Sequence, residues 1–305
     1  MATIRILLVD DNRQKELFFE PLADLASNIL RADLVQAYTF EEMKSIFEDN
    51  PYEYQAVILD GKGQKNDISK AEDDGFLNIA LKWLQAKNRE GVYIPFVIYS
   101  GYADELKKIF DDEAIYWKSK NEETKMLQDL QNKIKGTAYF NQALLFPDIY
   151  ELLDLKLLHS KYQPDIIKAT QTISDTYIGS LEDVLRSLRP MLEFTLYKLD
   201  ELSTTLFSTA CFKRGKIDLA GTLYFLAGSP KSVGDEVIFD SQEIIPLHIF
   251  FLAETIRKIT NSSAMHHYDV TASNNLAKSC IYAFIEYLMW FKKYIIENKI
   301  NYALI

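Results

Sequence analysis

Five polar side chains in the first half of the chain follow short apolar runs and have the types that phosphoryl chemistry requires. Asp60 ends the run AVIL, and the adjacent carboxylates Asp10 and Asp11 follow the run IRILLV. Ser100 follows IPFVIY, and Lys118 follows AIYW. A carboxylate can act as a nucleophile, several carboxylates together can hold a hard cation, and a lysine and a hydroxyl can bind phosphoryl oxygens.

The chain between these residues predicts that they lie at one edge of a sheet. Apolar runs of strand length alternate with amphipathic stretches, which is the pattern of an α/β doubly wound five-stranded parallel sheet. The carboxyl ends of parallel strands share an edge, and ligands bind in the crevice outside it. Three carboxylates there would raise one another's pKa unless a cation such as Mg²⁺ kept them ionised. The sequence therefore predicts a Mg²⁺-dependent phosphoryl site.

The elements that must position this site are short. The expected strands cover residues 4–9, 34–38, 56–59, 94–99 and 114–117. One helix is expected to end near residue 30, and the others to cover residues 40–47, 76–87, 103–111 and 122–134. We assign residues 1–135 to this first domain.

The motifs LLVDDN, ILDG, DGF, IYSGY and YWKS occur in this order within residues 4–135. Together they resemble the receiver domain of two-component response regulators. The resemblance implies that Asp60 is the phosphoacceptor, which takes its phosphoryl group from a sensor histidine kinase, a phosphotransfer protein or a small donor. The chain would then be a response regulator.

The resemblance also assigns the other residues of the site. It implies that Asp11 and Asp60 ligate Mg²⁺ directly, that Asp10 does so mostly through water, and that the Lys62 carbonyl supplies a backbone ligand. Ser100 and Lys118 are expected to bind the phosphoryl oxygens, as the catalytic and switch residues of the family do.

The chain departs from the receiver pattern in several places. The loop between Asp60 and Asp74 is longer than usual and lacks the usual proline, and the segment from Ser100 to Lys118 is shorter. Ser119 replaces the proline that follows the lysine, and Ile115 occupies the position of the rotating aromatic side chain. A receiver that serves only as a docking module is the alternative to one that is phosphorylated.

The second half of the chain has a helical pattern without alternating strands. Residues 136–147 lack a clear period and end on a proline, which predicts a linker. Beyond it we expect an all-α antiparallel helical bundle over residues 148–305. Its helices are expected at residues 148–159, 180–202, 217–227, 243–259 and 271–298, with a kink at Pro190.

A second candidate site lies in the segment ETIRKITNSSAMHHYDV. An asparagine at the end of one helix and a histidine before the next resemble the motif of the HEPN family, the "higher eukaryotes and prokaryotes nucleotide-binding" helical proteins. Asn261 and His266 stand at the motif positions, and His267 is the neighbouring candidate. Thr260 occupies the position of the family's arginine, and Arg257 could substitute because residues i and i+3 share a helix face. The resemblance implies a homodimer that binds RNA or is a degenerate ribonuclease.

Other interpretations of the bundle remain open. His266 and His267 could simply cap a helix junction, and the bundle could be a phosphorylation-dependent protein-interaction adaptor without catalysis. A histidine phosphotransfer bundle is a weaker alternative, because its candidate His159 falls at a helix end. A DNA-binding output is not expected, since no recognition helix is apparent.

Composition excludes several classes of protein. The chain has 305 residues, 48% of them hydrophobic, and a formal net charge of −10, so a nonspecific nucleic-acid binder is not expected. Cys211 and Cys280 lack metal-binding spacing and are expected to be buried thiols. No signal peptide and no apolar run of about 20 residues is present, so we expect a cytoplasmic protein without a membrane span.

Overall fold

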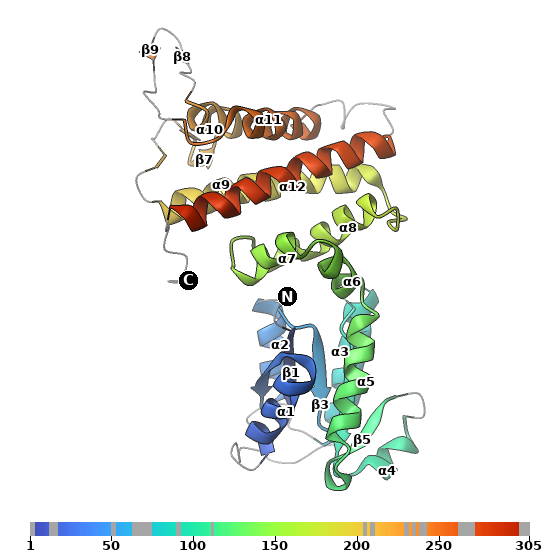
Figure 1. Cartoon of the computed structure of the whole chain (residues 1–305). Coiled ribbons are helices and arrows are strands. Elements are labelled where there is room, and N and C mark those ends of the chain that lie inside the picture. Colours follow the sequence, from blue (N-terminus) through green and yellow to red (C-terminus); the bar gives the residue numbers. More distant parts are fainter. Residues whose placement is uncertain are drawn as a thin grey trace. The chain divides into compact units, whose positions relative to one another are not determined.

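The computed structural model divides into two compact units, residues 1–145 and 146–305 (Figure 1). It describes residues 4–11, 18–49, 53–62, 75–89, 93–110, 113–203, 206–207, 211–228, 232–233, 236–237, 243–261 and 272–298. Among the helices in these ranges, none combines the length and the apolar composition that a membrane span needs.

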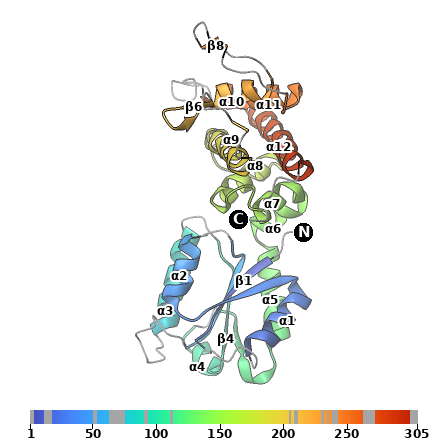
Figure 2. The same cartoon turned by 90° about the vertical axis from the view of Figure 1, so that its left-hand side faces the viewer.

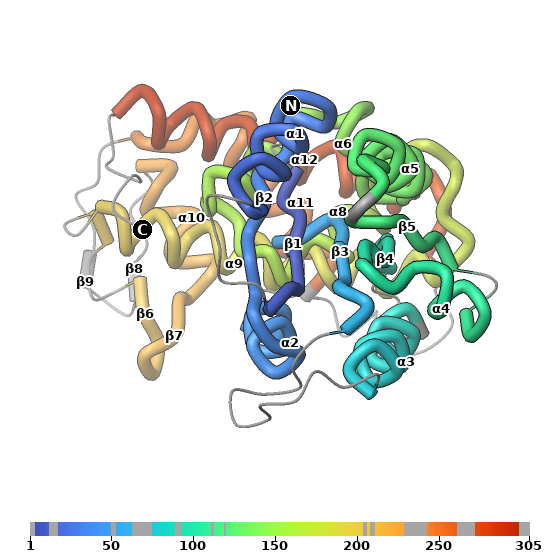
Figure 3. Tube along the Cα trace, turned by 90° about the horizontal axis from the view of Figure 1, so that it is seen from below, coloured from blue at the N-terminus to red at the C-terminus, as the bar shows by residue number. Residues whose placement is uncertain are grey.

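The first unit is built on a parallel sheet with the strand order β2-β1-β3-β4-β5, which confirms the predicted fold class. Figure 3 shows the strands as a row between two layers of helices. All four residues of the central strand β3 are buried, as expected for a strand covered on both faces. The strands are β1 (Ile4–Val9), β2 (Ala32–Ala37), β3 (Ala56–Leu59), β4 (Phe96–Ser100) and β5 (Ile115–Trp117).

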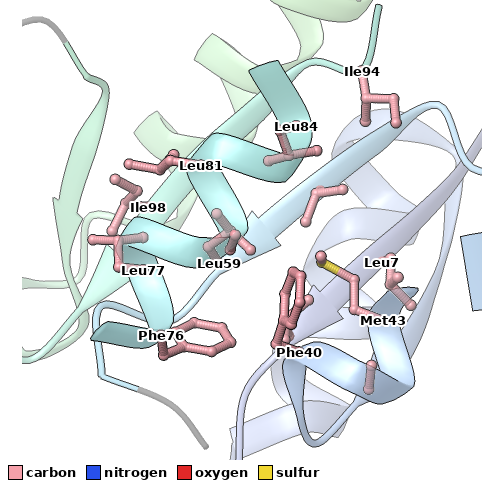
Figure 4. Close-up of a cluster of buried hydrophobic side chains, with 14 of the residues drawn as sticks. Leu7, Phe40, Met43, Leu59, Phe76, Leu77, Leu81, Leu84, Ile94 and Ile98 are labelled. Atoms are coloured by element: carbon pink, nitrogen blue, oxygen red, sulfur yellow. The ribbon is translucent and has the colours of Figure 1, made fainter. Parts of the chain in front are cut away.

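Helices cover both faces of this sheet (Figure 2). On one face, α2 and α3 pack through residues such as Phe40, Met43 and Leu77 against Leu7 and Leu59 of the strands (Figure 4). On the other face, α1 and α5 bury the second set of strand side chains. The helices of this unit are α1 (Glu20–Leu30), α2 (Phe40–Asp49), α3 (Gly75–Arg89), α4 (Ala103–Lys107), α5 (Glu123–Lys135) and α6 (Ala138–Leu145).

The segment predicted as a linker, residues 136–147, contains helix α6. The Thr137 hydroxyl donates to the Ile134 carbonyl at 2.7 Å and accepts from the Phe140 N–H at 3.2 Å, so it caps the new helix. The Phe140 ring packs against the hydrophobic cluster of the α1–α5 face. Because α6 is packed and capped, it belongs to the first unit and is not an irregular linker.

The second unit is predominantly helical, as predicted. Helix α12 packs against α7, α8, α9 and α11, so it is the central element of this unit (Figure 1). Buried Tyr287 of α12 is 2.9 Å from the Thr195 hydroxyl of α9. The helices are α7 (Pro147–Asp154), α8 (Gln163–Ile173), α9 (Leu181–Leu202), α10 (Leu219–Leu226), α11 (Leu247–Asn261) and α12 (Asn274–Glu297).

The second unit differs from the prediction in its smaller elements. Helix α8 was not expected, whereas α9 includes Pro190 within one helix, as predicted. The unit is also not purely helical, because it contains two short antiparallel strand pairs. These are β6 (Phe212–Lys213) with β7 (Lys216–Ile217) and β8 (Ser232–Val233) with β9 (Glu236–Val237), and a 3-10 helix η3 covers Ser160–Tyr162.

Candidate phosphoryl-transfer site

Asp60 lies directly after β3, at the carboxyl edge of the sheet, and is 9% exposed. Burial raises the pKa of its carboxyl from the ordinary 3.8 to about 6, and the negative charge of Asp10 adds to this rise. The nearby Lys118 ammonium opposes the rise but does not cancel it. The site therefore contains a desolvated carboxylate whose charged form depends on neighbouring cations.

Lys118 joins the two buried carboxylates. Its Nζ lies 2.5 Å from Asp10 Oδ2 and 2.9 Å from Asp60 Oδ2. Burial lowers the pKa of Lys118, but attraction to Asp60 and Asp10 exceeds that effect, and the net pKa is raised. The same ammonium lies 4.8 Å from the centre of the Phe18 ring, which stacks on Tyr99. Lys118 is thus a fixed cation within the candidate site.

Three carboxylates could hold a metal ion at this edge. The side chains of Asp10, Asp11 and Asp60 each offer one oxygen, and these oxygens lie within 4.8 Å of one another. Carboxylate oxygens are the ligands that Mg²⁺ prefers, so the donor set fits the ion that the sequence predicts. The Lys62 N–H donates to Asp60 Oδ1 at 3.5 Å, which places the Lys62 backbone beside the same carboxylate.

Ser100 ends β4 and is fully buried. Its Oγ accepts a hydrogen bond from the Tyr102 N–H at 3.1 Å, which leaves the hydroxyl hydrogen available for donation. Gly61 packs so closely that an added Cβ would lie 2.3 Å from Ser100 Oγ and 2.3 Å from Leu106 Cδ1. The glycine therefore lets the loop after β3 approach the loop after β4.

The departures from the receiver pattern have definite places in this unit. Ile115 is buried in the hydrophobic cluster of the α2–α3 face, and its neighbour Tyr116 donates its hydroxyl to Asp129 of α5. Lys118 begins a 3-10 helix, η2 (Lys118–Lys120), and the described backbone contains no cis peptide bond. Lys118 nonetheless reaches Asp60, so proline at position 119 is not required to direct it.

The second candidate site is only partly within the described residues. Arg257 Nε donates to Glu254 Oε1 at 2.6 Å, and its Nη2 donates to Oε2 at 2.9 Å. Glu254 is 4% exposed, and the Thr260 hydroxyl donates to the Ile256 carbonyl at 2.8 Å within α11. The backbone of Asn261 ends α11. Its side chain, together with His266 and His267, lies outside what the structure describes.

His159 does not have the geometry of a phosphotransfer histidine. Its Nδ1 accepts a hydrogen bond from the Lys161 N–H at 3.1 Å, where it caps η3. The proton of the neutral ring then lies on Nε2, which is a donor and not a nucleophile. Burial lowers the pKa of His159, and Lys161 and Lys198 add to the effect, so the neutral ring is favoured.

The structure brings together the predicted residues Asp10, Asp11, Asp60 and Lys118, and places Ser100 against the adjoining Gly61. Sequence reasoning assigned no role to Gly61, Tyr102 or Glu254, although the first two lie within the motifs ILDG and IYSGY. The pattern of a glutamate three residues before an arginine on one helix could have revealed the Glu254 pair, because such residues are neighbours on a helix surface. Tyr102 has no such signature: its N–H bonds to Ser100 two residues earlier, but its ring meets Lys62 of another loop.

Comparison with known proteins adds no relative to this description. No family model, curated protein or solved structure matches the chain with significant similarity.

Proposed function

We propose that the first unit accepts a phosphoryl group on Asp60 and thereby controls the helical second unit, as in a two-component response regulator. The observation that carries the proposal is the bridge of Lys118 between Asp10 and Asp60, at an edge that also holds Ser100. Carboxylate, lysine and hydroxyl are the three groups that phosphoryl transfer to an aspartate requires.

In the proposed reaction, a carboxylate oxygen of Asp60 attacks the phosphorus of the donor. A new bond forms between that oxygen and phosphorus while the bond to the leaving group breaks, and the leaving group takes its electron pair. Lys118 balances the negative charge on the phosphoryl oxygens, and the Ser100 hydroxyl donates a hydrogen bond to one of them. Mg²⁺ held by Asp10, Asp11 and Asp60 would supply charge neutralisation when bound.

Beryllofluoride with Mg²⁺ tests this proposal, because it imitates a phosphoryl group on a carboxylate. Binding is expected with wild type and should disappear in Asp60→Ala. Asp33→Asn, a change at an exposed carboxylate of β2, is the matched control and should bind like wild type. Equal metal-dependent binding by wild type and Asp60→Ala would show that Asp60 is not the acceptor.

For the second unit we propose an RNA-binding output with a degenerate nuclease site. A specific contact supports this choice: Glu254 holds one edge of the Arg257 guanidinium, and Nη1 makes no hydrogen bond within the described residues. A guanidinium fixed in this way can bind a phosphate, but the carboxylate cancels its charge. We therefore expect RNA binding with weak or no cleavage.

RNA binding should fall in Arg257→Ala and remain unchanged in Arg189→Ala, which removes a comparable pair with Glu193 from α9. Any cleavage should resist chelators, spare DNA and disappear in His266→Ala. If wild type neither binds nor cuts RNA, the adaptor function replaces this proposal. The measurement would then be whether the chain binds a protein partner only after phosphorylation.

A further inference from the structure

Lys118 is held by contacts on its backbone, although Ser119 stands where the receiver pattern has a proline. The Trp117 N–H, directly before the lysine, donates to Glu122 Oε2 at 2.8 Å. Trp117 and Glu122 flank the 3-10 helix η2, which begins with Lys118. The hydrogen bond therefore fixes the short segment from which the lysine side chain departs.

Two aromatic rings also face the Lys118 ammonium. Its Nζ lies 4.8 Å from the centre of the Phe18 ring and 5.8 Å from the centre of the Tyr99 ring. Both distances fall within the range of about 6 Å over which a cation is attracted to a ring. The two rings stack with an angle of 14° between their planes. The ammonium is thus held by aromatic rings as well as by the carboxylates of Asp10 and Asp60.

The Tyr99 ring is itself anchored to α5. It is buried, and its hydroxyl donates a hydrogen bond to Oε1 of Glu123, the first residue of that helix. Burial raises the pKa of Tyr99, and the hydrogen bond to Glu123 adds to the rise, so the hydroxyl remains a donor. Glu122 and Glu123 are adjacent in the chain. Together they fix the backbone and the aromatic surroundings of the same lysine.

These contacts are independent of the charge on Asp60. A phosphoryl group bonded to Asp60 occupies one of its carboxylate oxygens and removes the negative charge of the carboxyl group. The contacts of Lys118 with Phe18 and Tyr99 do not involve Asp60, so they persist when the negative charge moves to the phosphoryl oxygens. A long lysine side chain loses rotamer freedom when it binds a ligand, and one that is already held loses less.

We propose that Phe18, Tyr99, Glu122 and Glu123, named the lysine cradle, position Lys118 for the phosphoryl oxygens in place of the proline of the receiver pattern. The inference rests on the proposed function. The members of the lysine cradle are positioning residues, since they act on the phosphoryl group through the lysine. Phe18 is the best member to test, because its ring is partly buried whereas Tyr99 is 2% exposed.

Calorimetry of the full chain with beryllofluoride and Mg²⁺ tests the lysine cradle. Phe18→Leu should weaken beryllofluoride binding roughly fivefold, the equivalent of one cation–π contact, without weakening Mg²⁺ binding. Phe18→Tyr keeps a ring and should bind like wild type. Glu122→Ala should also weaken beryllofluoride binding, whereas Glu122→Gln keeps an oxygen that can accept from the Trp117 N–H and should retain it.

A double-mutant cycle separates positioning of the lysine from a general effect on packing. In the Lys118→Met background, Phe18→Leu should cause no further loss of beryllofluoride affinity, because the ammonium that the ring positions is gone. An equal loss in the wild-type and Lys118→Met backgrounds would overturn the inference, since the ring would then act without the lysine.

Phe140→Leu is the matched control. Its ring packs against the same hydrophobic cluster as Phe18 but comes from α6, so the variant makes the same change in side-chain size and should bind beryllofluoride like wild type. If wild type does not bind beryllofluoride with Mg²⁺, the proposed function fails and this inference fails with it. If wild type binds and both Phe18→Leu and Glu122→Ala bind equally well, this inference alone is overturned.

Discussion

Gly61 and Ser100 approach so closely that a methyl group on residue 61 would lie 2.3 Å from the serine hydroxyl oxygen. Real Cβ atoms do not approach other atoms to this distance, so a side chain at this position requires one of the two loops to move. The Ser100 side chain is fully buried, so it has no free space into which it could move away from such a group. The carboxyl edge of the sheet is therefore packed tightly enough to depend on one glycine.

Gly61→Ala is expected to destabilise the first unit by about 1–3 kcal/mol, the usual cost of overpacking a well-packed interior. It should also weaken beryllofluoride binding, because Ser100 must shift away from the phosphoryl position. Gly101→Ala is the control, since a Cβ there would meet nothing within 4 Å. Urea unfolding and fluoride titration of both variants check the prediction, and equal behaviour would contradict the packing argument.

The stability of the metal-free protein should depend on pH through Asp60. The folded pKa of about 6 exceeds the ordinary 3.8, so the neutral form is favoured by folding. This contribution, up to about 3 kcal/mol, is present below about pH 4 and is lost as the pH rises through 6. Asp60→Asn should therefore gain stability relative to wild type between pH 4 and pH 7.

Urea unfolding in the presence of a chelator measures that difference. Asp33→Asn should follow wild type across the same range, because the Asp33 carboxylate is exposed. Adding Mg²⁺ at neutral pH should narrow the gap between Asp60→Asn and wild type, since the ion favours the charged carboxylate. If the difference in unfolding free energy between Asp60→Asn and wild type does not change with pH, the Asp60 carboxyl is less buried than the structure shows.

Lys118→Met should change metal binding and phosphoryl-analogue binding in opposite directions. Without the ammonium between Asp10 and Asp60, the metal ion alone offsets the repulsion between the two carboxylates. Mg²⁺ should therefore bind roughly tenfold more tightly. Beryllofluoride should bind more weakly, because its fluorines lose their cation. Calorimetry measures both, with Lys120→Met as the control. Parallel losses of both ligands would point to general disruption of the site.

Glu254 and Arg257 should show strong coupling in stability. Arg257→Ala leaves the Glu254 carboxylate, which is 4% exposed, with Lys258 Nζ at 3.9 Å as its remaining cationic partner among the described residues, and should cost about 3 kcal/mol. Replacing both residues by alanine should cost less than Arg257→Ala alone, since no unpaired charge stays buried. Arg189→Ala should cost under about 1 kcal/mol, because its partner Glu193 is more exposed. Unfolding by urea distinguishes these values.

The sequence predicted the sheet well because its inner strands β1, β3 and β4 are mostly buried. A run such as Ala56 to Leu59 contains no polar residue, which predicts a strand covered on both faces. The alternation of such strands with helices then allows only a few sheet topologies. The carboxylates and Lys118 followed from the same rule, since each stands where a strand ends. Site residues that directly follow a strand can therefore be predicted from the positions of the apolar runs.

Element boundaries and contacts between loops were less predictable. Helix α11 begins at Leu247 and not at residue 243, because Pro246 disfavours helical backbone in the residue before it. Helix α7 ends at Asp154 and not at residue 159, and Lys156 soon after it adopts a left-handed backbone. The close approach of Gly61 to Ser100 depends on how two loops pack together, which no local pattern in the chain encodes.

Helix α6 defines where the first unit can be separated from the rest of the chain. Phe140 contributes to the hydrophobic cluster that also holds α1 and α5. A fragment that stopped at residue 135 would expose that cluster, whereas one that stopped after Leu145 would keep its cover intact. A fusion or truncation that separates the two units should therefore have its breakpoint after α6, so that the helix stays with the sheet that it covers.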